Sequence, residues 1–292
     1  MNSTRRSWRN LSISAVAALC AVAASAATPL PRTHSHNDYE HKRPLFDALD
    51  QGFCSVEADI YLVDGKLLVA HDRKDVRPDR TLEALYLDPL KARCQANGGH
   101  VYPELGSDPK LRRPLAAKAP DVEFTLLIDI KSDGAAVYPV LRETLRRHAG
   151  MLTRFTPTST RPGAVTVILS GNRPTDLVAA ETERLCAIDG RLSDLEPGTA
   201  SVHLVPLVSE SWQKVLADRK QAVQEARAAG TFHPADFMPR REIELAHAQG
   251  RRVRFWDVPA DPAMWRALKD AGVDLINADD LAGLARFLQG QP

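Results

Sequence analysis

The 292-residue chain is poor in aromatic residues and carries almost no net charge. Phe, Trp and Tyr together make up 6% of it, and 38 Lys and Arg nearly balance 37 Asp and Glu, which leaves a formal charge of +1. This composition gives no electrostatic reason to expect nucleic acid or an anionic membrane surface as a partner. The remaining content, 44% hydrophobic and 26% charged, is that of a globular protein and excludes collagen-like, disordered and coiled-coil chains.

Cysteine is scarce, and the glycine-rich motifs of nucleotide sites are missing. The four cysteines form no CxxC pair and no Cys/His cluster that would suggest structural zinc. Neither GxGxxG nor GxxxxGK(S/T) occurs, so no dinucleotide site or P-loop is indicated. No internal repeat or low-complexity tract is present, and the length suits one large α/β domain or two smaller ones.

Long apolar runs are absent except near the N-terminus, where Ile13–Ala24 follows a basic segment with three arginines. Ala24-Ser25-Ala26 then offers a small-residue cleavage site, so we expect residues 1–26 to be a secretory signal peptide. The run is too short to serve as a stable membrane anchor. We therefore expect residues 27–292 to be exported, periplasmic or secreted, with the general and the twin-arginine routes both open.

Removal of the signal peptide leaves three cysteines, Cys54, Cys94 and Cys186. An odd number in an exported protein permits at most one disulfide together with a free thiol. Cys54 lies in an apolar run and is expected to be a buried thiol.

Strand-like apolar runs alternate with amphipathic helical stretches along residues 27–292. The expected strands are Phe53–Ile60, Glu123–Ile130, Ala164–Leu169, Val202–Val208, Arg252–Val258 and Val273–Asn277. The expected helices are Pro44–Gln51, Ala135–His148, Pro174–Leu185, Ser211–Ala229, Asp236–Gln249, Pro262–Ala271 and Asp280–Leu288. This alternation predicts an α/β fold, a (β/α)8 TIM barrel, in preference to a doubly wound sheet.

Two interruptions modify the barrel. Asp64-Gly65 separates two short apolar runs, which predicts a hairpin after Phe53–Ile60. The segment 77–121 breaks the rhythm with one helix-like stretch, Leu82–Ala96, followed by glycines and prolines. We interpret it as an insertion loop that covers the barrel mouth.

Two carboxylates lie on one face of the strand Phe53–Ile60. Side chains alternate along a strand, so Glu57 and Asp59 point to the barrel interior while their apolar neighbours face the helices. Two carboxylates crowded at a barrel mouth repel each other unless a cation lies between them, and oxygen ligands favour Mg²⁺ or Ca²⁺. The alternative is an ordinary salt-bridged pair near a loop.

The strand Glu123–Ile130 repeats this design with Asp129 and Lys131 on one face. Asp129 is a candidate third metal ligand, and Lys131 is a candidate group for holding an anionic substrate oxygen. The alternative is an internal Asp–Lys pair with the lysine in solvent.

Histidine and other polar residues follow several strands. His71 comes after the hairpin and is a candidate general acid or base, although a lone histidine there would be a surface residue. Trp256 alternates with Phe255, so one of them faces the interior, where a tryptophan could wall a substrate pocket. Asn277 either binds substrate or belongs to a segment that caps the last helix.

Together these residues resemble the phosphatidylinositol-phospholipase-C-like phosphodiesterase superfamily, and in particular the glycerophosphodiester phosphodiesterase domain. The resemblance rests on the order of His34, Glu57-Ala58-Asp59, Asp64-Gly65, His71-Asp72, Ile128-Asp129-Ile130-Lys131, Arg254-Phe255-Trp256 and Asp274-Leu275-Ile276-Asn277. It extends over residues 33–283. The subgroup named after altered inheritance of mitochondria protein 6 is similar through two further runs, His34-Ser35-His36-Asn37-Asp38-Tyr39 and Ser170-Gly171-Asn172-Arg173-Pro174.

The resemblance implies a metal-dependent phosphoric diester hydrolase with one divalent ion on Glu57, Asp59 and Asp129. It also implies acid–base catalysis by His34 and His71, with glycerophosphodiesters or phospholipid-type diesters as substrates. Candidate substrate or phosphate contacts are Lys131, His36, Asn37, Asn172, Trp256 and Asn277. In the main glycerophosphodiesterase pattern Arg-Gly follows the first histidine, whereas Ser35-His36-Asn37 stands here, so the usual phosphate-binding arginine is missing or replaced.

Two other functions fit parts of the sequence. His34 and His36 at the end of a first barrel strand also suit an amidohydrolase-like metallohydrolase, but later strands supply few further histidines. A non-catalytic secreted barrel that binds phospholipid headgroups or glycans is the third interpretation. Both histidines and all three carboxylates of the expected site are present, which favours the enzyme.

Overall fold

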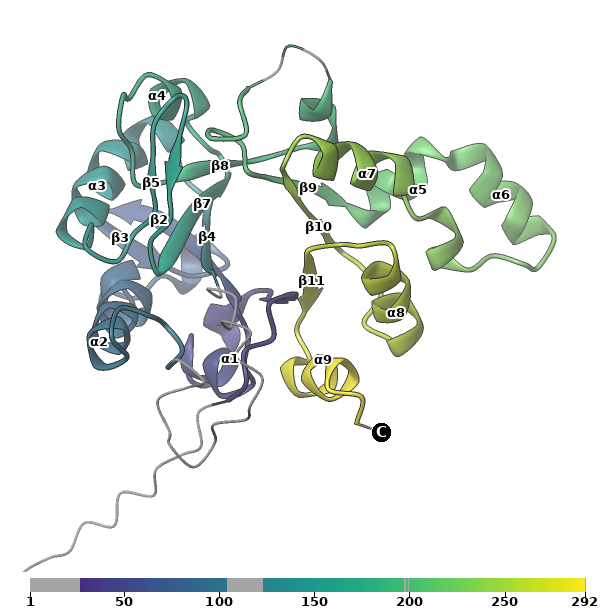
Figure 1. The fold of residues 1–292 in the computed structure, drawn as a ribbon, viewed down its shortest axis with the longest axis horizontal. Coiled ribbons are helices and arrows are strands. Elements are labelled where there is room, and N and C mark those ends of the chain that lie inside the picture. The colour runs from purple at the N-terminus through teal and green to yellow at the C-terminus, as the bar shows by residue number, and fades with distance from the viewer. Residues whose placement is uncertain (1–26, 104–122, 197, 199, 292) are drawn as a thin grey trace, which may run out of the picture.

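The computed structural model describes residues 27–103, 123–196, 198 and 200–291. Eight parallel strands form a closed barrel, with the helices arranged around its outside (Figure 1). The barrel strands are β1 Thr33–Ser35, β2 Ser55–Val63, β4 Phe124–Ile130, β7 Val165–Gly171, β8 Ala187–Gly190, β9 Leu207–Ser211, β10 Arg252–Trp256 and β11 Leu275–Ala278. The predicted TIM barrel is confirmed.

The helices occupy the connections between strands. They are α1 Phe46–Asp50, α2 Asp88–Ala96, α3 Gly134–Arg147, α4 Thr175–Ala179, α5 Trp212–Asp218, α6 Lys220–Ala228, α7 Arg240–Ala248, α8 Pro262–Asp270 and α9 Leu281–Leu288. Shorter turns are η1 Asp38–Glu40, η2 Arg73–Asp75, the π-helical η3 Glu83–Leu87, η4 Leu192–Leu195 and η5 Pro234–Phe237. The two-residue strands β5 Arg154–Phe155 and β6 Thr160–Arg161 form a separate hairpin.

The short strand β1 closes the barrel. On one side it pairs with β11, where His34 lies opposite Asn277, and on the other side Ser35 pairs with Val56 of β2. The predicted hairpin is also present, because β2 continues through Asp64-Gly65 into the antiparallel strand β3, Lys66–Val69. This return brings the chain back beside the end of β2, where the Ala70 N–H donates to the Asp59 carbonyl at 3.2 Å.

The strand alternation separates two cores. Val56, Ala58 and Ile60 are fully buried in the large cluster between strands and helices, as the sequence predicts. A smaller apolar cluster fills the barrel interior, with Leu127, Ile168, Ala187, Leu207 and Leu275 contributed by five strands and Phe155 by β5.

The barrel interior becomes polar one inward-facing position further along each of these five strands. The residues two positions after the apolar set are Asp129, Ser170, Asp189, Ser209 and Asn277, and four of them are buried. Because side chains alternate with a period of two, these residues form the next layer toward the carboxyl ends of the strands. Active sites of TIM barrels lie at that end.

The connection between β7 and β9 differs from the sequence-based expectation. The expected helix Pro174–Leu185 is only the five-residue α4, and β8 was not predicted at all. β8 has four residues and ends in Asp189-Gly190, a composition that does not distinguish a strand from a loop. Further on, β9 begins at Leu207, and the single helix expected for Ser211–Ala229 is two helices, α5 and α6.

Several expectations concern segments outside the described residues. The signal peptide 1–26 and most of the second half of the insertion 77–121 lie outside them, whereas the first half of the insertion contains η3 and α2. No helix in the described part of the chain is long and apolar enough to cross a membrane. Cys54, Cys94 and Cys186 are free, buried thiols, so the expected burial of Cys54 is confirmed.

Gly171 supports the polar end of the barrel. It has a φ of +66°, and a Cβ built there would lie 2.6 Å from the Ile130 carbonyl oxygen and would collide with the Asp129 carboxylate. Gly65 has a similar φ of +74° but nothing within 4 Å of its Cβ position. The two sites therefore share backbone strain and differ in steric conflict.

We predict that Gly171→Ala lowers the free energy of unfolding by about 3 kcal/mol, whereas Gly65→Ala lowers it by about 1 kcal/mol, the strain of a left-handed alanine alone. Urea denaturation of both variants measures the difference. Equal losses in the two variants would contradict the close packing of Gly171 against β4.

Candidate active site

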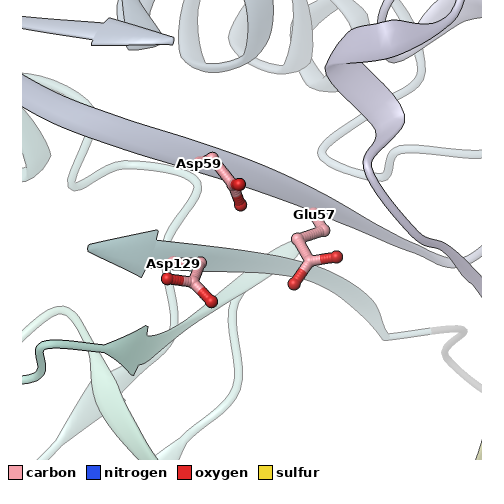
Figure 2. Close-up of side chains that lie close together, drawn as sticks. All are labelled: Glu57, Asp59 and Asp129. Atoms are coloured by element: carbon pink, nitrogen blue, oxygen red, sulfur yellow. The ribbon is translucent and has the colours of Figure 1, made fainter. Parts of the chain in front are cut away.

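Three carboxylates meet at the carboxyl ends of two neighbouring strands. Glu57 and Asp59 lie on β2, and Asp129 on β4 is the register partner of Asp59. One oxygen from each carboxylate lies within 4.8 Å of the others, and all three side chains point toward a shared space (Figure 2). This is the triad that the sequence predicts as metal ligands.

The triad carries more negative charge than its surroundings favour. Burial and the neighbouring Glu57 charge raise the pKa of Asp59 to about 6, and burial also raises the pKa of Asp129. Burial would raise the pKa of Glu57 as well, but the charge of Arg254 holds it well below its usual range. Two of the three carboxylates are therefore destabilised in their charged form.

The carboxylate oxygens of the triad that lack hydrogen-bond partners fit a divalent ion. The buried Asp59 Oδ1 has no hydrogen-bond partner among the described residues. Lys131 supplies part of the missing positive charge, with its Nζ 3.1 Å from Asp59 Oδ2 and 3.3 Å from Asp129 Oδ1. An oxygen-only donor set with unpaired buried oxygens suits Mg²⁺ or Ca²⁺ better than a thiophilic metal.

Tyr39 connects the triad to His71. Its hydroxyl lies 2.6 Å from Asp59 Oδ2, 2.6 Å from Asn37 Oδ1 and 3.0 Å from His71 Nδ1. The His71 Nδ1 is also 3.3 Å from Asp59 Oδ2, and the side chain is 57% exposed. Since Nδ1 is engaged, Nε2 is the nitrogen of His71 that can exchange a proton with a substrate.

The two histidines near β1 occupy different environments. His34 is fully buried, its Nδ1 is 2.7 Å from the Ser55 hydroxyl, and burial lowers its pKa to about 3. Its Nε2 lies 3.9 Å from Glu57 Oε2 and has no hydrogen-bond partner among the described residues, but no part of the imidazole is exposed. The His36 side chain is 23% exposed, with Nε2 3.7 Å from Glu57 Oε2 and Nδ1 2.9 Å from Asp279 Oδ1.

His36 is also the better basic group of the two. Burial alone would lower its pKa, but the hydrogen bond with Asp279 and the negative charge of Glu57 together raise it. The raised pKa keeps the imidazole charged closer to neutral pH, where it can give or take a proton.

A buried aspartate holds the loop that carries His36 and Asn37. Asp38 is fully buried and accepts hydrogen bonds from the Leu45 N–H, the Ser35 hydroxyl and the Tyr86 hydroxyl. Asn37 has a left-handed backbone, with φ 46°, and its N–H donates to Glu57 Oε2 at 3.2 Å. Asn37 thus contacts the triad through its backbone and Tyr39 through its side chain.

The strands β10 and β11 complete the wall beside Glu57. Arg254 Nε donates to Asn277 Oδ1 at 2.9 Å, and its Nη2 is 3.4 Å from Glu57 Oε1. Asn277 therefore orients Arg254, while Asp280 caps α9. Phe255 packs among the helices, and Trp256 lies against the guanidinium groups of the barrel mouth.

Asn172, a proposed substrate contact, bonds away from the triad. Its exposed side chain donates from Nδ2 to the Ser132 carbonyl at 3.2 Å, so it fastens the loop after β4. Three residues without a predicted role are important instead, namely Tyr39, Arg254 and Asp38. All three lie in runs that resemble the family, and Arg254 had a physical signal as well, since an arginine at an inward position of an apolar strand needs a buried anion.

Comparison with known proteins gives the family. Residues 24–189 match the AIM6-like phosphodiesterase domain, which is more than half of the chain. A protein of Arthroderma benhamiae named altered inheritance of mitochondria protein 6 homolog is 31% identical over 87% of this chain and 82% of its own length. The chain belongs to the AIM6-like phosphodiesterase family. Altered inheritance of mitochondria protein 6 of Lachancea thermotolerans is 30% identical over 86% of this chain and 64% of its own length.

Solved structures are similar at greater distance. A glycerophosphodiester phosphodiesterase from Agrobacterium tumefaciens is 17% identical, with a TM-score of 0.47, and covers 89% of this chain and 100% of its own. One from Parabacteroides distasonis is 14% identical, with a TM-score of 0.49, and covers 90% of this chain and 99% of its own.

The raised pKa of Asp59 predicts a pH-dependent stability in the metal-free protein. A carboxyl whose pKa rises on folding, here from 3.8 to about 6, stabilises the fold below its unfolded pKa and loses this contribution as the pH rises through 6. Relative to Asp59→Asn, the wild-type free energy of unfolding should fall by roughly 2 kcal/mol between pH 4 and pH 7 in EDTA.

Denaturation in EDTA at both pH values measures this difference. Adding Mg²⁺ or Ca²⁺ at pH 7 should raise the Tm of the wild type more than that of Asp59→Asn, because the ion replaces the missing proton. If the difference in free energy of unfolding between the wild type and Asp59→Asn did not change with pH, this result would contradict the repulsion within the triad.

Proposed function

We propose that the protein is a metal-dependent phosphoric diester hydrolase that acts on glycerophosphodiester or phospholipid-type substrates. The observation that carries this proposal is a triad of carboxylates beside the partly exposed imidazole of His36 and the exposed imidazole of His71, with a lysine amino group within 3.3 Å. Membership of the AIM6-like phosphodiesterase family supports the same reaction class.

Glu57, Asp59 and Asp129 would hold one divalent ion, Mg²⁺ or Ca²⁺. When bound, such an ion supplies Lewis-acid stabilisation of the negative charge that builds on phosphoryl oxygens. Lys131 adds a positive charge that can bind a phosphoryl oxygen directly, since Asp59 and Asp129 are the anions that compete for it among the described residues.

Proton transfer is assigned to His36 and His71, in place of the expected pair His34 and His71. One imidazole removes the proton from a hydroxyl group, either of water or of the substrate. The oxygen forms a bond to phosphorus while the bond from phosphorus to the leaving oxygen breaks. The other imidazole gives its proton to the leaving alkoxide, which departs as an alcohol. Attack by a substrate hydroxyl would give a cyclic phosphate first.

Two residues support these histidines without touching the substrate. Tyr39 keeps Nδ1 of His71 engaged, and Asp279 does the same for Nδ1 of His36. Both imidazoles therefore keep Nε2 for the substrate. An amidohydrolase-like site is disfavoured, because the group of potential metal ligands found among the described residues contains no histidine.

The assay measures alcohol or choline release from glycerophosphocholine, lysophosphatidylcholine and an aryl phosphodiester, with Mg²⁺, Ca²⁺ or EDTA. Turnover should require the ion and be lost in Glu57→Ala. His36→Gln and His71→Gln should each lower kcat by about 10² to 10⁴, the usual contribution of a general acid or base.

His34→Gln and His247→Gln are the comparison variants. His247 lies on α7 and pairs with Asp274 just before β11, away from the carboxyl ends of the strands, so its variant should leave kcat unchanged. His34→Gln should lower the Tm and retain more activity than His36→Gln, because it acts through packing. Metal binding without turnover on any diester would favour the non-catalytic headgroup-binding barrel, and a greater kcat loss in His34→Gln would restore His34 as the catalytic group.

A further inference from the structure

A second group of charged side chains lies at the barrel mouth, on the strands that follow the acidic triad. β7 ends at Gly171 and β8 at Gly190, and these strands pair in parallel with Leu169 opposite Ile188. Arg173 follows β7 by two residues and Arg191 follows β8 by one. The register therefore brings both arginines to the same end of the barrel on adjacent strands.

Arg191 is held in a fixed orientation. Its Nη1 donates to the Gly190 carbonyl at 2.8 Å and to Asp189 Oδ2 at 3.2 Å, and its guanidinium lies 5.0 Å from the centre of the Trp256 ring. Asp189 is fully buried and is itself fixed by hydroxyl groups of Ser170 and Ser209, at 2.8 and 2.6 Å. Within the described residues, the hydrogen bonds of the Arg191 side chain all use Nη1, so the rest of the guanidinium is available to a ligand.

Arg173 is partly buried, and its side chain has no ion pair or hydrogen bond with any described residue. Burial and the positive charge of Arg191 lower its pKa, and the negative charges of Asp189, Asp194 and Asp129 offset this only in part. The other cations of the mouth are paired, Lys131 with Asp59 and Asp129, and Arg254 with Glu57. A partly buried guanidinium that lies beside a second guanidinium, and that has no carboxylate in direct contact among the described residues, would be stabilised by a bound anion.

We propose that Arg173 and Arg191 form a second anion subsite that recognises a carboxylate or phosphate group on the substrate, separate from the scissile phosphodiester. This inference rests on the proposed function and specifies its substrate class, a diester whose alcohol part carries a further anionic group. Trp256 forms the apolar wall of the subsite, and the buried Asp189 network holds Arg191 in place.

The spacing of the strands indicates that the two arginines bind a second anionic group of the substrate and not the scissile phosphodiester. The triad lies on β2 and β4, and Lys131 directly follows β4. Arg173 follows β7, the next strand, and Arg191 follows β8, two strands from β4 around the barrel. Neighbouring strands lie about 4.8 Å apart, so β4 and β8 are separated by roughly 10 Å. That distance matches two anionic groups joined by a short alcohol rather than two oxygens of one phosphoryl group.

Two matched diesters test the subsite in the active protein. Ethyl p-nitrophenyl phosphate and 2-carboxyethyl p-nitrophenyl phosphate share a leaving group and differ in one carboxylate. The wild type should have a KM about tenfold lower for the carboxylate substrate, with similar kcat. Arg173→Gln, which removes no protein contact, should abolish this preference and leave the KM for the ethyl substrate unchanged. Arg191→Gln should do the same.

The control is Arg146→Gln at the far end of α3, about 20 Å along the helix from its first residue at the mouth. Arg146 pairs with Glu143 on the surface, and its variant should keep the wild-type preference. Equal loss for both substrates in Arg173→Gln would show that the arginines hold the scissile phosphoryl group, which overturns the second subsite.

A binding measurement distinguishes an error in the proposed subsite from an error in the proposed function. In calorimetric titrations with EDTA, the wild type should bind phosphoglycolate about tenfold more tightly than ethyl phosphate, and Arg173→Gln should bind both equally. This ratio does not depend on turnover. If the ratio holds without turnover, the subsite stands and the hydrolase proposal fails. If turnover occurs and the wild type binds the two probes equally, the subsite is wrong.

Discussion

The carboxylates of Glu57, Asp59 and Asp129 repel one another at the end of two strands that the barrel forces to be neighbours. The parallel pairing of β2 and β4 puts Asp59 and Asp129 side by side, and neither can move away without breaking the barrel ladder. The surrounding structure compensates for this repulsion in three ways. Arg254 pairs with Glu57, Lys131 bridges the two aspartates, and the Tyr39 hydroxyl donates a hydrogen bond to Asp59.

Each compensating group is in turn held by a structure of its own. Asn277 orients Arg254 from the next strand. Tyr39 lies in η1 next to the buried Asp38, which is fixed by hydrogen bonds from Leu45 and Tyr86. Gly171 allows β7 to pass close behind Asp129. The barrel thus keeps the triad crowded, and a divalent ion would relieve the remaining repulsion while the histidines at either side stay in contact with solvent.

Acidic and basic side chains lie on different sides of the barrel mouth. The acids of β2 and β4 face a region suited to a cation, whereas the arginines after β7 and β8 face a region suited to an anion. A substrate with two negative groups would contact both sides at once. Such division gives specificity, because a diester without the second group leaves Arg173 unpaired.

The acidic triad and the barrel could be predicted because both follow from the alternation of side chains along strands. Glu57, Asp59 and Asp129 each interrupt an apolar run at an inward position, which is visible without a structure. The difference between His34 and His36 could not be predicted, since β1 has only three residues and its end is uncertain by one or two positions. Tyr39 and Arg173 lie in connections, where no periodicity fixes the direction of a side chain.

A crystal structure of the protein grown with Mn²⁺, with anomalous diffraction to locate the ion, tests the central claim most directly. Mn²⁺ accepts the oxygen ligands that suit Mg²⁺ and Ca²⁺. The account predicts one ion in contact with oxygens of Glu57, Asp59 and Asp129, with Lys131 moved away from both aspartates. A triad that stays free of the ion at saturating Mn²⁺, with Lys131 still between Asp59 and Asp129, would contradict it.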